Sequence, residues 1–135
     1  MFVAKLADAG STGSFVWAQA AGDQGDDRAT ALTVNGTSMY VVGGFGSATV
    51  RFGSVTLANA SANSGTSDTF VAKLTDAGPT GSFVWAQRAG GTDTDVATAL
   101  AVSGTSVYVA GSFGSATAGF GAVTLANVGT SGLTT

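Results

Sequence analysis

The heptapeptide GSFVWAQ at residues 13–19 occurs again, unchanged, at residues 81–87, and its two copies hold both tryptophans of the chain. Shifting the sequence by 68 residues aligns the copies, and this register holds without a gap to the end, with about two-thirds of the aligned positions identical. A long internal period is typical of solenoids, propellers and arrays. We therefore divide the chain into two tandem repeats, residues 1–68 and 69–135.

Every aromatic residue obeys the same shift, so each has a fixed place in the repeating unit. Large aromatic side chains commonly anchor cores and interfaces, whereas a catalytic or ligand-stacking aromatic is more often unique. The sequence therefore predicts six structural anchors of the repeats, which are Trp17, Trp85, Tyr40, Tyr108, Phe45 and Phe113.

The composition favours short strands and tight turns and excludes several kinds of chemistry. The chain has 21 glycines, a single proline and only 10% charged residues. It has neither cysteine nor histidine, which excludes disulfides, thiolate or imidazole catalysis and the usual zinc sites. Its net charge is −3 and its five basic residues are scattered, so no nucleic-acid partner is expected.

No targeting or membrane segment is visible in this chain. The start, MFVAKLADAG, lacks the apolar core and cleavage site of a secretory signal. No apolar run reaches the length of about 18 residues needed for a membrane span, so no membrane insertion is expected. If the natural protein is exported, its signal lies outside this chain.

Two hairpins are predicted in each repeat. In the first repeat, the runs at residues 2–6 and 14–19 flank a turn rich in Asp and Gly, and the runs at 29–34 and 39–45 flank Asn35-Gly36, a strong hairpin signal. A further pair of short strands is expected within residues 48–59 and again one repeat later. The strands are apolar on both faces, which suits sheets packed between neighbouring sheets.

The order DTFVAKL, turn, FVWAQRAGG, ATALAV, turn, VYVAGSF resembles the bacterial β-propeller repeat family often called SBBP repeats. The chain departs from the shortest repeats of that family in the longer link at residues 47–67. The resemblance implies all-β, blade-type repeats of four antiparallel strands. The chain would then hold a half blade, a complete blade at about residues 29–88, and a second half blade.

Open half blades expose unpaired edges and apolar faces that must be covered. We therefore expect head-to-tail self-association into a homo-oligomer. With two blade-equivalents per chain, three copies would give six blades and four would give eight, and a contact that does not close would give a filament. The resemblance also implies an extracellular or bacterial cell-surface location, with a surface protein or a glycan as a further partner.

Candidate chemistry is sparse. The loops GDQGDD and GGTDTD offer Asp23, Asp27, Asp93 and Asp95 as weak calcium ligands, but no bidentate glutamate follows, and solvated turn aspartates are the favoured interpretation. Asp8 and Asp76 are expected to cap their turns. No catalytic residue, cofactor site or enzyme activity is predicted.

Two classes of function remain open at this point. The first is a non-catalytic structural or interaction module of an exported repeat protein. The alternative is a lectin-like propeller, with one shallow loop site per repeat at residues 23–27 and 92–95.

Overall fold

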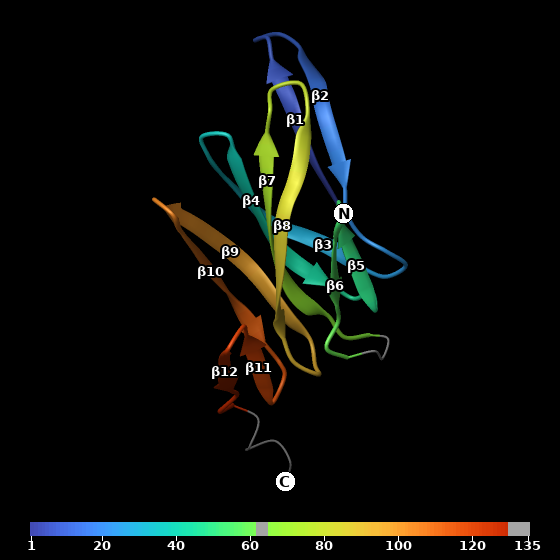
Figure 1. Ribbon diagram of the computed structural model, residues 1–135, viewed down its shortest axis with the longest axis vertical. Coiled ribbons are helices and arrows are strands. Elements are labelled where there is room, and N and C mark those ends of the chain that lie inside the picture. The colour runs from blue at the N-terminus through green and yellow to red at the C-terminus, as the bar shows by residue number, and fades with distance from the viewer. Residues whose placement is uncertain (62–64, 130–135) are drawn as a thin grey trace.

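The computed structural model of the protein describes residues 1–61 and 65–129 (Figure 1). These residues form twelve strands, paired antiparallel, and no helix, which confirms the predicted all-β class. The first repeat contributes β1 (Phe2–Asp8), β2 (Gly13–Ala20), β3 (Asp27–Asn35), β4 (Ser38–Phe45), β5 (Thr49–Phe52) and β6 (Val55–Ala58). The second contributes β7 (Asp68–Asp76), β8 (Gly81–Gly90), β9 (Asp95–Ser103), β10 (Ser106–Phe113), β11 (Thr117–Phe120) and β12 (Val123–Ala126).

Consecutive strands pair into the predicted hairpins, two long and one short in each repeat. In the β3–β4 hairpin Asn35 pairs with Ser38, so the turn residues are Gly36 and Thr37, one position later than the sequence signal suggested. Gly36 has a φ of 62°. A glycine with positive φ at the first position of a two-residue turn suits the right-handed twist of hairpin strands.

A six-stranded antiparallel sheet in the order β12-β11-β8-β7-β4-β3 runs through the molecule, and its four long strands, β3, β4, β7 and β8, occupy the centre (Figure 1). It joins the two repeats, because β4 of the first repeat pairs with β7 of the second over eight residue pairs, from Ser38 opposite Thr75 to Phe45 opposite Asp68. The four long strands of this sheet lie in residues 27–90, close to the range of about 29–88 over which the resemblance implies one blade.

Two long hairpins flank this sheet as separate two-stranded sheets. The hairpin β1–β2 packs against β8 on one side. The hairpin β9–β10 lies on the other side, with β9 against β3 and β4, and Thr30 Oγ1 donates a hydrogen bond to the carbonyl oxygen of Ala97 at 2.6 Å. Both flanking hairpins keep a free strand edge within the described chain.

Each short hairpin attaches near the end of the second strand of its repeat, which is β2 in the first repeat and β8 in the second. In the second repeat β11 extends the central sheet by pairing with β8, with Gly119 opposite Gly90. At the equivalent positions of the first repeat, Arg51 forms a bridge with Gly22, just beyond β2. Figure 1 places β1–β2 and β11–β12 at opposite ends of the molecule.

The hydrophobic core lies between the first repeat and the hairpin β7–β8. Phe52 of the short hairpin is fully buried, with ring centroids 4.8 Å from Phe70 and 5.4 Å from Phe83. Val41 and Leu74 from the central sheet complete the same cluster. Burying one such side chain stabilises the fold by about 1.5–3 kcal/mol. The short hairpin is therefore a part of the core and fills the space between neighbouring long hairpins.

Candidate assembly interface

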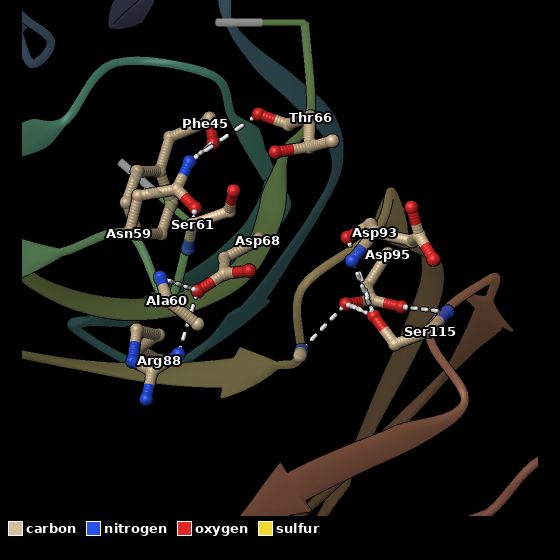
Figure 2. Close-up of polar contacts among 11 residues, drawn as sticks. Phe45, Asn59, Ala60, Ser61, Thr66, Asp68, Arg88, Asp93, Asp95 and Ser115 are labelled. Atoms are coloured by element: carbon tan, nitrogen blue, oxygen red, sulfur yellow. Dashed lines mark hydrogen bonds and ion pairs between the residues drawn. The ribbon is translucent and has the colours of Figure 1, made fainter. Parts of the chain in front are cut away.

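Two of the predicted calcium candidates, Asp27 and Asp95, brace equivalent loops. Both carboxylate oxygens of Asp27 accept hydrogen bonds from Ser47 Oγ, at 2.9 and 2.8 Å. One repeat later, Asp95 accepts a hydrogen bond from Ser115 Oγ at 2.8 Å (Figure 2). Each carboxylate therefore connects the start of a strand, β3 or β9, to the Gly-Ser segment that leads into the short hairpin of the same repeat.

The other two candidates differ between the repeats. Asp23 accepts a hydrogen bond from Thr49 Oγ1 at 3.0 Å, whereas Asp93 uses its backbone N–H to donate to Ser115 Oγ at 2.9 Å (Figure 2). In the described ranges 1–61 and 65–129, no group of three or more His, Cys, Asp or Glu side chains could hold a metal ion. The side-chain partners of these aspartates come from the segments that lead into the short hairpins, and calcium binding stays a prediction.

A buried aspartate that the sequence did not single out lies at the start of β7. Asp68 Oδ2 accepts hydrogen bonds from Arg88 Nη1 at 2.6 Å and from the backbone N–H of Ala60 at 2.7 Å, whereas Oδ1 has no hydrogen-bond partner (Figure 2). Burial raises the pKa of the Asp68 carboxyl, as does the negative charge of Asp95, while Ala60 and Arg88 oppose the rise. The position equivalent to Asp68 one repeat earlier lies outside this sequence, directly before Met1.

The first repeat contacts the turn between β7 and β8 through a set of side chains on β1–β2. We name this contact the joint, and it is formed by Lys5, Trp17 and Gln19 on one side and by Asp76, Gly78 and Gly81 on the other. The Trp17 ring lies so close to Gly81 that a Cβ on this glycine would be 2.7 Å from ring carbons. Only glycine fits there without displacing the ring.

Polar contacts fix the orientation of the joint. Trp17 Nε1 donates to Asp76 Oδ1 at 3.2 Å, and Lys5 Nζ lies 2.8 Å from Asp76 Oδ2. The pKa of the Asp76 carboxyl is lowered, first by the hydrogen bond from Lys5 and then by the backbone N–H of Gly78. Gln19 Nε2 donates to the carbonyl oxygen of Gly81 at 2.7 Å. The Asp76 turn thus receives both an aromatic ring and a cation.

Both halves of the joint occur a second time without each other. Lys73, Trp85 and Gln87 stand at the positions of Lys5, Trp17 and Gln19, and Asp8, Gly10 and Gly13 stand at the positions of Asp76, Gly78 and Gly81. No cross-repeat hydrogen bond or ion pair of these six residues occurs among residues 1–61 and 65–129, apart from the β4–β7 ladder. A Cβ on Gly13 would meet only a backbone oxygen, at 3.8 Å.

The aromatic cluster of the core is repeated in the same divided form. Phe120 is the counterpart of the buried Phe52 but is 43% exposed, while Phe2 and Phe15, the counterparts of the other two rings, are 73% and 72% exposed. The three phenylalanines lie on hairpins at opposite ends of the molecule (Figure 1). Each end therefore presents one part of a cluster that is complete in the middle.

The backbone edges follow the same pattern. Within the described chain β1 pairs only with β2 and β10 pairs only with β9, although the equivalent strands β7 and β4 pair with each other. Leu6 on β1 is 55% exposed, and its counterpart Leu74 is fully buried. An unpaired edge with exposed apolar side chains is a template for pairing with another strand.

The six predicted anchors lie in unequal environments. Trp17, Tyr40 and Phe45 are buried, Trp85 and Phe113 are partly buried, and Tyr108 is 62% exposed. The first repeat is covered by β7–β8, whereas the corresponding face of the second repeat has no such cover in the described chain. The sequence showed equivalent positions, but it could not show that only one copy has a neighbour.

Compared with known proteins, the chain matches no protein-family model, no curated protein and no solved structure. The resemblance to SBBP repeats therefore stays a prediction. Among residues 1–61 and 65–129, no helix has the length and apolar character that crossing a bilayer requires.

Proposed function

We propose that this chain is a non-catalytic structural module of an exported, surface-associated repeat protein, and that its copies join head to tail. The single observation that carries the proposal is the β4–β7 ladder, which joins one repeat to the next across eight residue pairs. The free edges of β10 and β1 are the equivalent strands of that ladder. A second copy of the chain is therefore the partner whose edge has the matching length and side chains.

The internal ladder supplies the register of the proposed contact. Tyr40 lies opposite Lys73 and Val41 opposite Ala72 in the observed pairing. In the proposed contact, β10 of one copy takes the place of β4, and β1 of the next copy takes the place of β7. This places Tyr108 of one copy opposite Lys5 of the next, and Val109 opposite Ala4. The same side chains would then face the same neighbours as in the central sheet.

In this interpretation the central sheet is a propeller blade and the flanking hairpins are half blades, as the resemblance implies. Three copies would close a ring of six blades and four copies a ring of eight, whereas a rotation that does not close would give a filament. The repetition argues against an enzyme, because no unique constellation of catalytic side chains breaks it.

The test is the assembly state of the Leu6→Asp variant. Leu6 is largely exposed in the single chain, so the variant should fold, but a charge at this position would lie in the core of the completed blade, where an unpaired charge is strongly unfavourable. Sedimentation velocity should show oligomers of the unmodified chain and monomers of the variant. Val16→Asp is the matched control, because Val16 and its counterpart Val84 are both exposed. A compact monomer of the unmodified chain at all concentrations would overturn the proposal.

A surface hollow favours ligand binding as the second candidate function. It lies between β3–β4 and the loop before β9, has a volume of about 590 Å³, and is lined by Asp26, Arg28, Thr94 and Val96 among others. The hollow adjoins the loops that the sequence proposed for a lectin-like site. Binding on a glycan array that is lost in Arg28→Ala would support this candidate, and the absence of any bound glycan would remove it.

A further inference from the structure

We infer that Lys73, Trp85 and Gln87 of one copy bind the Asp8 to Gly13 turn of the next copy, as a second joint. The inference rests on the proposed head-to-tail assembly and goes beyond it, because it names side-chain contacts outside the strand edges that decide which end meets which. The observed joint between Trp17 and Gly81 is its template.

The receiving turn already has the required shape in the single chain. The backbone N–H of Gly10 donates to Asp8 Oδ1 at 2.8 Å, as Gly78 does to Asp76 at 2.9 Å. The backbone N–H of Ala9 donates to the Thr12 carbonyl at 2.8 Å, and the equivalent bond of the second turn has the same length. The two turns are therefore built alike, and little of the Asp8 turn has to be rearranged on binding.

The space for the incoming ring is also present. In the observed joint the Trp17 ring fills the volume next to Gly81, whereas the corresponding volume next to Gly13 is open within the described chain. Trp85 is only partly buried, and Lys73 lies 5.8 Å from the centroid of the Tyr40 ring, with no acidic partner among residues 1–61 and 65–129. An indole and an ammonium group on the hairpin β7–β8 therefore match an open glycine and a carboxylate at the turn between β1 and β2.

The two halves of this joint are different surfaces, so the contact is heterologous. The hairpin β7–β8 of one copy offers a ring and a cation, and the Asp8 turn of the next copy offers the glycine and the carboxylate that receive them. Repeated from copy to copy, a contact between two unlike surfaces either closes a ring or extends a filament. The joint therefore gives the assembly a direction, and end-to-end contacts of the same kind are disfavoured.

Gly13→Val tests the fit of the ring. The φ of Gly13 is not in the left-handed region and the site is open, so the single chain should fold normally. In the assembly the new side chain would overlap the Trp85 ring, and overpacking of this kind should weaken the dissociation constant roughly tenfold to a hundredfold. Ser14→Val is the matched control, because Ser14 and its counterpart Ser82 are both exposed.

A charge exchange tests the partner of Lys73. Asp8→Lys alone and Lys73→Asp alone should each weaken assembly by about tenfold, since each replaces an attraction by a repulsion. A 1:1 mixture of the two variants should assemble almost as well as the unmodified chain, with the variants alternating, which native mass spectrometry can count. Thermal unfolding of each variant checks that the single chains remain folded.

The outcomes separate this inference from the proposed function. If Leu6→Asp blocks assembly but Gly13→Val and the charge variants assemble as tightly as the unmodified chain, the edge pairing holds and the second joint is wrong. If the unmodified chain never assembles, both are wrong. Loss of assembly in Gly13→Val together with rescue in the mixture would establish the joint.

Discussion

Replacing Phe52 and Phe120 separately with alanine should distinguish residues that stabilise the single chain from residues that stabilise the assembly. The two residues are equivalent in the repeats, but Phe52 is fully buried against Phe70 and Phe83 whereas Phe120 is 43% exposed. Phe52→Ala should lower the free energy of unfolding by about 3–5 kcal/mol, as expected for a large cavity in a core. Phe120→Ala should lower it by only about 1–2 kcal/mol, because less contact is lost in the single chain.

In the assembled state, Phe120 should contribute to the binding free energy between neighbouring copies. A phenylalanine buries about 200 Å² when fully enclosed, so the 43% that is exposed corresponds to about 85 Å² that a neighbouring copy would cover. At about 25 cal/mol per Å² this area contributes about 2 kcal/mol, or a roughly thirtyfold change in the dissociation constant.

Urea unfolding, followed by circular dichroism at a concentration below assembly, measures the first effect, and sedimentation velocity across a concentration series measures the second. The reasoning would be refuted if Phe120→Ala assembled as tightly as the unmodified chain. It would also be refuted if Phe52→Ala destabilised the fold no more than Phe120→Ala does.

Three further predictions follow from the loops and the buried acid. Ser11→Pro, which copies Pro79 of the second repeat, should stabilise the chain by about 0.4–1 kcal/mol in thermal unfolding, since it restricts the unfolded chain at a turn of the same shape; a lower melting temperature would contradict this. Asp68 has a raised pKa, so the folded state binds its proton more tightly than the unfolded state, and its contribution to stability falls as the pH rises through the folded pKa. Asp68→Asn should therefore be at least as stable as the unmodified chain at pH 7, and its stability should no longer show this decrease with pH. A strongly destabilised variant would contradict this prediction. Removing calcium with EDTA should leave the melting temperature unchanged, because Asp27 and Asp95 already accept hydrogen bonds from Ser47 and Ser115; a drop of several degrees would restore the calcium interpretation.

The hairpins could be predicted from the sequence because their signals are local. Turn glycines such as Gly36 and Gly104 separate apolar runs, and both take the positive φ that the turns need. Because the two repeats align without a gap, each hairpin predicted in the first repeat is also predicted in the second. Even so, the β3–β4 turn lies one residue later than the Asn35-Gly36 signal, since Asn35 itself pairs with Ser38.

The interface could be predicted only in outline. Open half blades indicated that the ends would need covering, but Asp76, the partner of Trp17, lies 59 residues further along the chain, and no local pattern encodes how the two hairpins pack. Asp68 was not predicted, because the candidate residues lie in segments that recur in both repeats and the position equivalent to Asp68 lies outside this sequence. The extra hairpin was expected, yet its role in carrying Phe52 into the core became visible only with the fold.

Disulfide trapping of the proposed edge pairing tests the central claim most directly. The chain has no cysteine, so an Ala4→Cys, Val109→Cys double variant introduces one thiol at each end, at positions that should lie opposite each other in neighbouring copies. Mild oxidation should give a ladder of covalently linked chains on a non-reducing gel. The control variant Lys5→Cys, Val109→Cys places the thiols on opposite faces of the sheet, because side chains alternate along a strand, and should remain unlinked. Monomers from the first variant, or equal linking in both, would contradict head-to-tail assembly in the register of the central sheet.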